Sequence, residues 1–157
     1  MRETFRARRA LFILFIIYCI AMLLLLFARR RAFIAESYRE QLKMNLNLIP
    51  LETIRRYVYV LRYNSNPYML KFAHFNIAGN VAAFIPFGFF LPSLFNKQRK
   101  FFVFIASVVG TVSAVELTQL FTLRGSCDVD DLILNLIGSL IGFLLWRIAF
   151  RLYKKKS

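Results

Sequence analysis

Long apolar runs separated by short polar stretches dominate the chain. A helix needs about 20 mostly apolar residues to cross the roughly 30 Å hydrocarbon layer of a bilayer. Four segments have this character, namely residues 10–28, 75–95, 101–123 and 132–150. The first is the clearest, because ALFILFIIYCIAMLLLLFA carries no charge and lies between arginines. The pattern predicts an all-α integral membrane protein with four transmembrane helices in a single domain over residues 1–157.

The first apolar run follows a basic start, which is also typical of a secretory signal. This run is long, and Arg29, Arg30 and Arg31 follow it in place of a small-residue cleavage site. We therefore expect a retained membrane anchor, with these three arginines at the lipid headgroups.

The connection between the first two spans is long for so small a protein and needs structure of its own. Residues 36–63 have helix-forming composition interrupted at Pro50, and Leu51, Ile54, Val58 and Leu61 are spaced for one helical face. Two arrangements fit this pattern. The segment is either an interfacial helix lying on the headgroups or a helix packed across the mouth of the bundle.

Composition and charge agree with a membrane location. The chain is 59% hydrophobic with 18 Phe, too apolar for a soluble domain, and its net charge is +14. The basic residues flank the spans and no nucleic-acid-binding motif accompanies them, so we expect contact with lipid headgroups and not with nucleic acid. The short segment 96–100 has three basic residues and no acid, whereas 124–131 has one basic residue and three acids. Positive charge favours the cytoplasmic side, so the termini are predicted to be cytoplasmic and the acidic loop external.

Polar side chains inside the second and third spans are costly in hydrocarbon and need an explanation. Asn76 and Asn80 are four residues apart on one helical face, where they either bridge helices or contact a ligand. Glu116 shares a face with Ser113 and Gln119. An ionisable group in such a position is a functional candidate. The alternative is a neutral, protonated Glu116 held by the asparagine amides.

The start of the fourth span carries a further polar face. Asp131, Asn135, Gly138 and Gly142 follow at spacings of four, three and four, and the two glycines form a GxxxG pair that permits close approach of another helix. Asp128 and Asp131 lie where a carboxylate can cap the helix, which accounts for one of the two. Capping leaves the convergence of the other polar residues on this membrane boundary unexplained.

The ordered motifs NIAGNVAAFIPFG, ELTQ and RGSCDVDDLILNLIGSLIG resemble those of the VanZ-like membrane proteins, and NLIPLETI resembles that family's entry to the segment. The resemblance implies a small multi-span protein of the bacterial cytoplasmic membrane, in a family named for a member associated with reduced sensitivity to teicoplanin. It places the family's polar positions on a set of eight residues: Asn76, Asn80, Glu116, Gln119, Arg124, Asp128, Asp131 and Asn135. Asp130 lies outside the shared pattern and is interpreted as an extra loop charge.

These residues support three hypotheses. The first is an outward-facing polar cleft that binds a polar lipid, a lipid-linked envelope precursor or a lipoglycopeptide, with Arg124 pairing with a phosphate or carboxylate. The second is an enzyme acting on such a lipid, with Glu116 or Asp128 as general base. The third is a structural network acting through partner proteins.

No resident cofactor is predicted from the sequence. A divalent cation such as Mg²⁺ held by Glu116, Asp128 and Asp131 is conceivable. Cys19 and Cys127 have no CxxC or histidine partner nearby, so they indicate neither a disulfide framework nor a zinc site.

Overall fold

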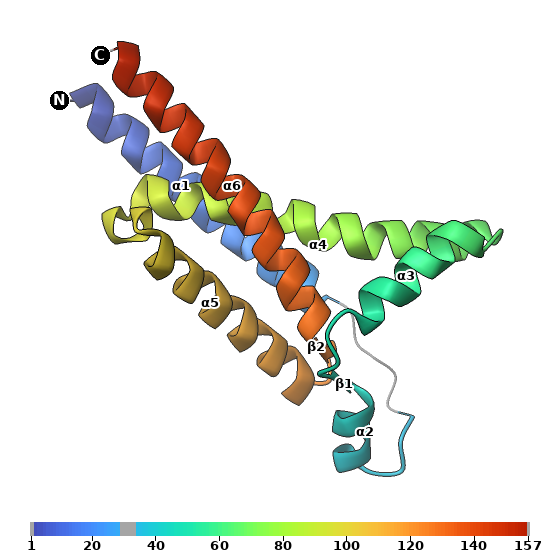
Figure 1. Ribbon diagram of the computed structural model, residues 1–157. Helices are drawn as coiled ribbons and strands as arrows, with labels where there is room; N and C mark the ends of the chain where they lie inside the picture. The colour runs from blue at the N-terminus through green and yellow to red at the C-terminus, as the bar shows by residue number, and fades with distance from the viewer. Residues whose placement is uncertain (1, 29–33, 157) are drawn as a thin grey trace.

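The computed structural model describes residues 2–28 and 34–156, so Arg29 to Arg31 lie outside the described residues. The described chain is almost entirely helical (Figure 1). Its elements are, in order, α1 Arg2–Phe27, α2 Tyr38–Met44, β1 Leu46–Asn47, α3 Glu52–Tyr63, α4 Pro67–Leu94, the 3₁₀ helix η1 Asn96–Arg99, α5 Phe101–Phe121, β2 Cys127–Asp128 and α6 Val129–Lys156. Four of these helices, α1, α4, α5 and α6, are long and apolar enough to cross a membrane, which confirms the predicted fold class.

Three of the long helices, α1, α5 and α6, run alongside one another between two ends of the molecule, and α4 crosses them, with its first half extending away from them toward α3 (Figure 1). The N-terminus of α1, the C-terminus of α6 and η1 lie toward one end, at the upper left of Figure 1. The α5–α6 connection, β1, β2 and α2 gather at the other end. The basic segment 96–100 is therefore on the same side of the bundle as the termini, and the acidic loop is on the opposite side.

Two of the predicted spans begin earlier than the apolar pattern suggests. The helix α4 starts at Pro67 and not near residue 75, because the Asn66 side chain accepts a hydrogen bond from the Tyr68 amide (2.9 Å) and Pro67 occupies the first turn. The helix α6 starts at Val129 and continues to Lys156, beyond the predicted 132–150. Polar first and last turns extend both helices past their apolar parts.

Glycines bring α4 and α6 into backbone contact. A Cβ atom added at Gly138 would lie 2.1 Å from the Val81 carbonyl oxygen, and one at Gly142 would lie 2.0 Å from the Ile85 carbonyl oxygen. Gly88 makes the reciprocal approach to α6, where its added Cβ would meet the carbonyl oxygen of Ser139 at 1.9 Å. The GxxxG pair thus serves the close helix contact that its spacing predicts, and its partner is α4.

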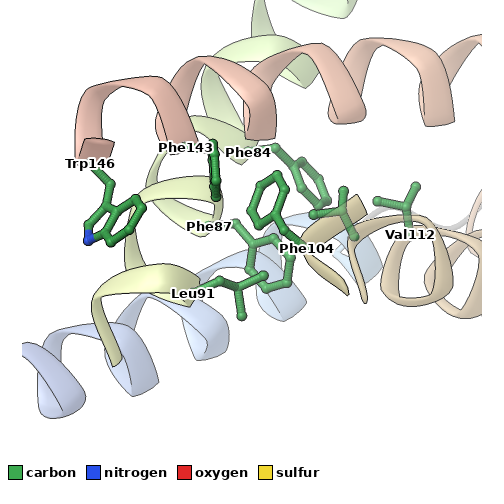
Figure 2. Close-up of a cluster of buried hydrophobic side chains, with 8 residues drawn as sticks. Phe84, Phe87, Leu91, Phe104, Val112, Phe143 and Trp146 are labelled. Atoms are coloured by element: carbon green, nitrogen blue, oxygen red, sulfur yellow. The ribbon is translucent and has the colours of Figure 1, made fainter. Parts of the chain in front are cut away.

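Next to this contact, a mainly aromatic cluster joins α4, α5 and α6 (Figure 2). Its buried members are Phe84, Phe87 and Leu91 of α4, Phe104, Val108 and Val112 of α5, and Phe143 and Trp146 of α6. The helix α1 packs on the α4 side, where the rings of Phe15 and Tyr18 contact Phe90 and the Tyr18 hydroxyl donates to the Ala83 carbonyl (2.7 Å). Together these contacts hold the four long helices against one another.

The segment between α1 and α4 is attached to the bundle at its middle. The strand β1 pairs in parallel with β2, with Leu46 opposite Cys127 and Asn47 opposite Asp128. The helix α3 then leaves the bundle end and runs beside the first half of α4, with the Tyr57 and Phe72 rings 6.0 Å apart (Figure 1). Of the two arrangements expected for this segment, packing across the mouth of the bundle is therefore the one that the start of α3 adopts. Of the predicted apolar face, Val58 is 49% exposed and so does not pack against the bundle, whereas Tyr57, which lies outside that face, is half-buried.

Candidate functional site

A polar cavity of about 870 Å³ lies at the end of the bundle that holds the α5–α6 connection. Its walls come from the end of α1, the segment from Met44 through α3, the first half of α4, the end of α5 and the start of α6. The structure brings all eight predicted polar residues to this cavity: Asn76, Asn80, Glu116, Gln119, Arg124, Asp128, Asp131 and Asn135. A ligand-binding role for them stays a prediction, but their convergence is a property of the fold.

The two asparagines of α4 differ in what they contact. The Asn80 amide nitrogen donates to an Asp131 carboxylate oxygen at 2.6 Å and so links α4 to α6. The Asn76 amide nitrogen donates to the Phe72 carbonyl of its own helix (2.7 Å). Of the two alternatives considered for this pair, the helix bridge is formed by Asn80, whereas the Asn76 amide bonds within its own helix.

Glu116 is 6% exposed and is held by the backbone of the loop that follows its helix. Its Oε2 accepts a hydrogen bond from the Asp128 amide at 3.1 Å. In the alternative to a functional role, the α4 amides would hold this side chain, but Asn76 and Asn80 donate to the Phe72 carbonyl and to Asp131 instead. Glu116 thus connects the end of α5 to the start of α6 while it lines the cavity.

Asp128 accepts hydrogen bonds from both sides of the cavity. Its Oδ1 accepts from the Asp130 amide (2.9 Å), which caps α6 and accounts for one of the two acids at this helix start, as the sequence predicts. Its Oδ2 accepts from the Thr53 hydroxyl (2.6 Å), and Asn47 donates to both oxygens at 3.3 Å. The residue therefore joins α6 to β1 and α3.

Gln119 and Arg124 bind the end of α1. The Gln119 amide donates to the Leu26 carbonyl (2.8 Å), and the Arg124 guanidinium donates through Nη1 to the Phe27 carbonyl (2.9 Å). Carbonyls in the last turn of a helix have no partner within the helix, so these two side chains satisfy groups that α1 leaves open. They hold α1 at the cavity wall.

Asp130 is the main correction to the sequence analysis. It is fully buried and is not an extra loop charge. Its carboxylate accepts hydrogen bonds from the Leu51 amide and from the Ile54 amide (3.0 Å), at the first turn of α3. A carboxylate in this position satisfies open N–H groups and favours the helix dipole. It also fixes Leu51, whose φ of 67° is unfavourable for a residue with a side chain.

Asn135 has a buried polar atom without a partner. The side chain is 4% exposed, it lines the cavity, and its Oδ1 accepts no hydrogen bond from the residues that the structure describes. Ser139, one turn further along α6, is also buried with an unpartnered hydroxyl within the described chain, but it is not part of the cavity lining. An unsatisfied buried acceptor is costly in a folded protein, and a ligand donor would remove that cost.

Several polar residues of the site belong to the segment before α4 and were not predicted individually. Asn45, Asn47, Thr53 and Arg56 line the cavity. Gln41, only 2% exposed, supports Asn45 by donating from Nε2 to its Oδ1 (3.3 Å), and accepts from the Ile34 (2.9 Å) and Ala35 (3.2 Å) amides. The signal for Asn47 and Thr53 was present, because both lie in the NLIPLETI stretch.

The described residues of the cavity do not form the metal site that the sequence made conceivable. Among residues 2–28 and 34–156, no three His, Cys, Asp or Glu side chains are placed to hold an ion together. The Mg²⁺ site suggested by Glu116, Asp128 and Asp131 is therefore not formed.

Burial raises the pKa of the Cys127 thiol beside the cavity, and the Glu116 and Asp128 carboxylates raise it further. A raised pKa lowers the fraction of the reactive thiolate form at a given pH.

The fold and the cavity define a small helical protein of the membrane, with several spans and a polar chamber built at one end of its bundle. The sequence profile of the VanZ/LLP1 family matches residues 15–150. The chain belongs to this family. No curated protein and no solved structure matches it significantly.

Proposed function

We propose that the cavity binds the headgroup of a polar lipid or of a lipid-linked molecule of the cell envelope. The observation that carries this proposal is the unpartnered Asn135 oxygen in a cavity of about 870 Å³. Pockets that bind small molecules usually enclose about 300–1,000 Å³ and have a few converging polar groups. The size and lining of this cavity fit such a ligand.

The lining indicates the chemistry of the headgroup. Arg56 and Arg124 can pair with a phosphate or carboxylate. Asn135 Oδ1 and the buried Glu116 carboxyl group accept hydrogen bonds from hydroxyl or amine groups. The favoured ligand therefore combines an acidic group with hydrogen-bond donors, as in a glycerol, sugar or amino headgroup.

The proposed site faces the outer leaflet of the bacterial cytoplasmic membrane. Support comes from the basic segment 96–100, which lies at the same end of the bundle as the termini, whereas the cavity lies at the other end. At this position the protein would influence envelope properties or sensitivity to glycopeptides through the lipid that it binds. In a background without native cysteines, an impermeant thiol reagent applied to intact cells should label Ser126→Cys and not Lys97→Cys; the reverse pattern would place the cavity inside.

The other two hypotheses receive less support from the geometry. A general base needs free access to a substrate proton. Of the two candidates, Asp128 already accepts hydrogen bonds from Thr53, Asn47 and the Asp130 amide, and Glu116 is 6% exposed and accepts one from the Asp128 amide. A purely structural network accounts for Gln119 and Arg124, which hold α1. It leaves Asn135 unexplained.

Asn135→Leu tests the proposal, because the described residues donate no hydrogen bond to Asn135 Oδ1. Replacing an unpartnered amide by an apolar side chain of similar size should leave stability equal or higher. Loss of one ligand hydrogen bond should weaken binding of added phosphatidylglycerol by about threefold to tenfold, measured by native mass spectrometry in mild detergent. The same variant should lose any effect of the parent on teicoplanin sensitivity in cells.

Ser139→Ala is the matched control, because it removes an unpartnered buried polar group on the same helix outside the cavity lining. It should bind phosphatidylglycerol like the parent. If both variants bind this lipid with the affinity of the parent, and sugar-bearing and amine-bearing lipids give the same result, the proposed headgroup site is wrong.

A further inference from the structure

A second hollow, of about 840 Å³, lies between α1 and α5. Leu23 and Phe27 of α1 form one wall. Small side chains form the other wall, at Ala106, Ser107, Gly110, Thr111, Ala114 and Thr118 of α5. Their spacing of three and four residues puts them on one face of the helix. We call this hollow the α1–α5 groove.

The floor of the groove is open. A Cβ atom added at Gly110 would meet no atom within 4 Å, so the glycine is not needed for a close helix contact within this chain. From Ala106 to Thr122 the lining covers a helix length of about 24 Å, at about 1.5 Å per residue. That length is most of the roughly 30 Å hydrocarbon layer. The groove can therefore accompany an extended hydrocarbon chain through much of the membrane.

The groove is continuous with the polar cavity. Val115 and Arg124 line both hollows. Arg124 uses Nη1 for the Phe27 carbonyl, and its other guanidinium N–H groups make no hydrogen bond with the described residues. A cation with free donors thus lies where the apolar groove meets the polar chamber. This sequence of surfaces, apolar then cationic then polar, matches the chain, phosphate and headgroup of a phospholipid.

We propose that the α1–α5 groove holds a hydrocarbon chain of the same lipid whose headgroup occupies the cavity, with the lipid phosphate at Arg124. The inference rests on the proposed function and adds the chemical class, a phosphate-containing lipid with a chain long enough to follow α5. A helix from a second copy would match the small residues of α5, since such residues let helices approach closely. It would leave the arginine and the polar chamber without a complementary group.

The test uses the full chain in phosphatidylcholine nanodiscs that contain a phosphatidylglycerol with a photoreactive diazirine on one acyl chain. After illumination and trypsin digestion, adducts are mapped to peptides, of which 101–124 covers α5 and 10–29 covers the apolar part of α1. Gly110→Phe fills the groove. Gly79→Phe is the control, because an added Cβ at Gly79 also meets no atom within 4 Å and the residue is absent from the lining of both hollows.

In the parent, adducts should concentrate on peptides 101–124 and 10–29. Gly110→Phe should reduce labelling of 101–124 at least about fivefold, because a bulky side chain cannot share the groove with the lipid chain. Gly79→Phe should not reduce it. Arg124→Gln should reduce labelling, since the amide can still donate to the Phe27 carbonyl but no longer carries the charge that pairs with phosphate. This variant lacks the tryptic site after residue 124, so its peptide 101–147 is compared with the sum of 101–124 and 125–147 in the parent.

Failure of the inference and failure of the proposed function give different results. If Asn135→Leu and excess glycerol 1-phosphate reduce labelling but Gly110→Phe acts like Gly79→Phe, the headgroup site stands and the groove proposal is overturned. If Gly110→Phe reduces labelling while the other two treatments do not, the groove holds a chain without the cavity and the proposed function is wrong. Efficient disulfide-linked dimers of Ala114→Cys would assign the groove to a second copy.

Discussion

Gly142→Ala is the sharpest test of how the site is assembled, because it adds a single methyl group at the α4–α6 contact. The new Cβ would lie 2.0 Å from the Ile85 carbonyl oxygen and 2.8 Å from the Phe89 amide nitrogen. Cβ atoms in proteins essentially never approach closer than 3.0 Å. Since the obstacle is main chain on a second helix, α4 and α6 must separate by about 1 Å to accept the methyl group.

The expected cost of this overpacking is about 1–3 kcal/mol. Alanine is also the better helix former, by up to about 1 kcal/mol, which partly offsets the loss. Gly79→Ala cancels this second effect, because Gly79 also lies in a long membrane helix but has open space around an added Cβ. The difference between the two variants therefore measures the helix contact.

Thermal unfolding in mild detergent, followed by fluorescence-detected size exclusion, provides the measurement. Gly79→Ala should melt at or above the temperature of the parent, and Gly142→Ala should melt lower, by roughly 2–4 °C for each kcal/mol in a chain of this size. Separation of the helices should also lengthen the 2.6 Å hydrogen bond from Asn80 to Asp131 and weaken lipid binding. Equal melting temperatures for the two alanine variants would refute the close α4–α6 contact.

Three further predictions address the cap of α3, the aromatic cluster and the loop thiol. Asp130→Ala should destabilise the docking of α3 by about 1–2 kcal/mol through loss of two amide hydrogen bonds, detected as faster limited proteolysis within residues 52–63; unchanged proteolysis would contradict the cap. Phe104→Ala should cost about 3 kcal/mol and Phe102→Ala almost nothing, because Phe104 is fully buried and Phe102 is 84% exposed; melting curves that coincide would be inconsistent with the cluster. In a Cys19→Ala background, maleimide should label Cys127 more slowly in the folded protein than in SDS. The difference should shrink as pH rises through the elevated pKa of the folded thiol, and a pH-independent ratio would count against that shift.

The spans were predictable because hydrophobic length is a local property of the chain. Asn80 and Glu116 were also predictable, because a polar group within an apolar run needs a partner or a cavity, and both line one. The glycines at positions 138 and 142 indicated a close helix contact. In each case the signal lies within a single helix.

The partners were not predictable in the same way. Asp130 has the character of a loop acid in the sequence, since the amides that it caps are 76 and 79 residues away. Gln119 and Arg124 bind main-chain carbonyls of α1, which every residue type possesses and no sequence pattern reveals. The buried face of α3 depends on where α4 runs beside it, so the spacing of its apolar residues does not show which of them contact the bundle, and Val58 is 49% exposed.

The pairing of β1 with β2 has a consequence for the order of synthesis. At about 5–20 residues per second, the ribosome adds Asp130 roughly 4–16 s after Leu51, the residue whose amide it binds. Throughout that interval, the turn that opens α3 lacks its cap and β1 lacks its partner strand. A nascent chain can therefore place its first three spans before the chamber has all its walls. In a chain that ends before α6, α2 and α3 would not be attached to the bundle and would be accessible to the quality-control proteases of the membrane.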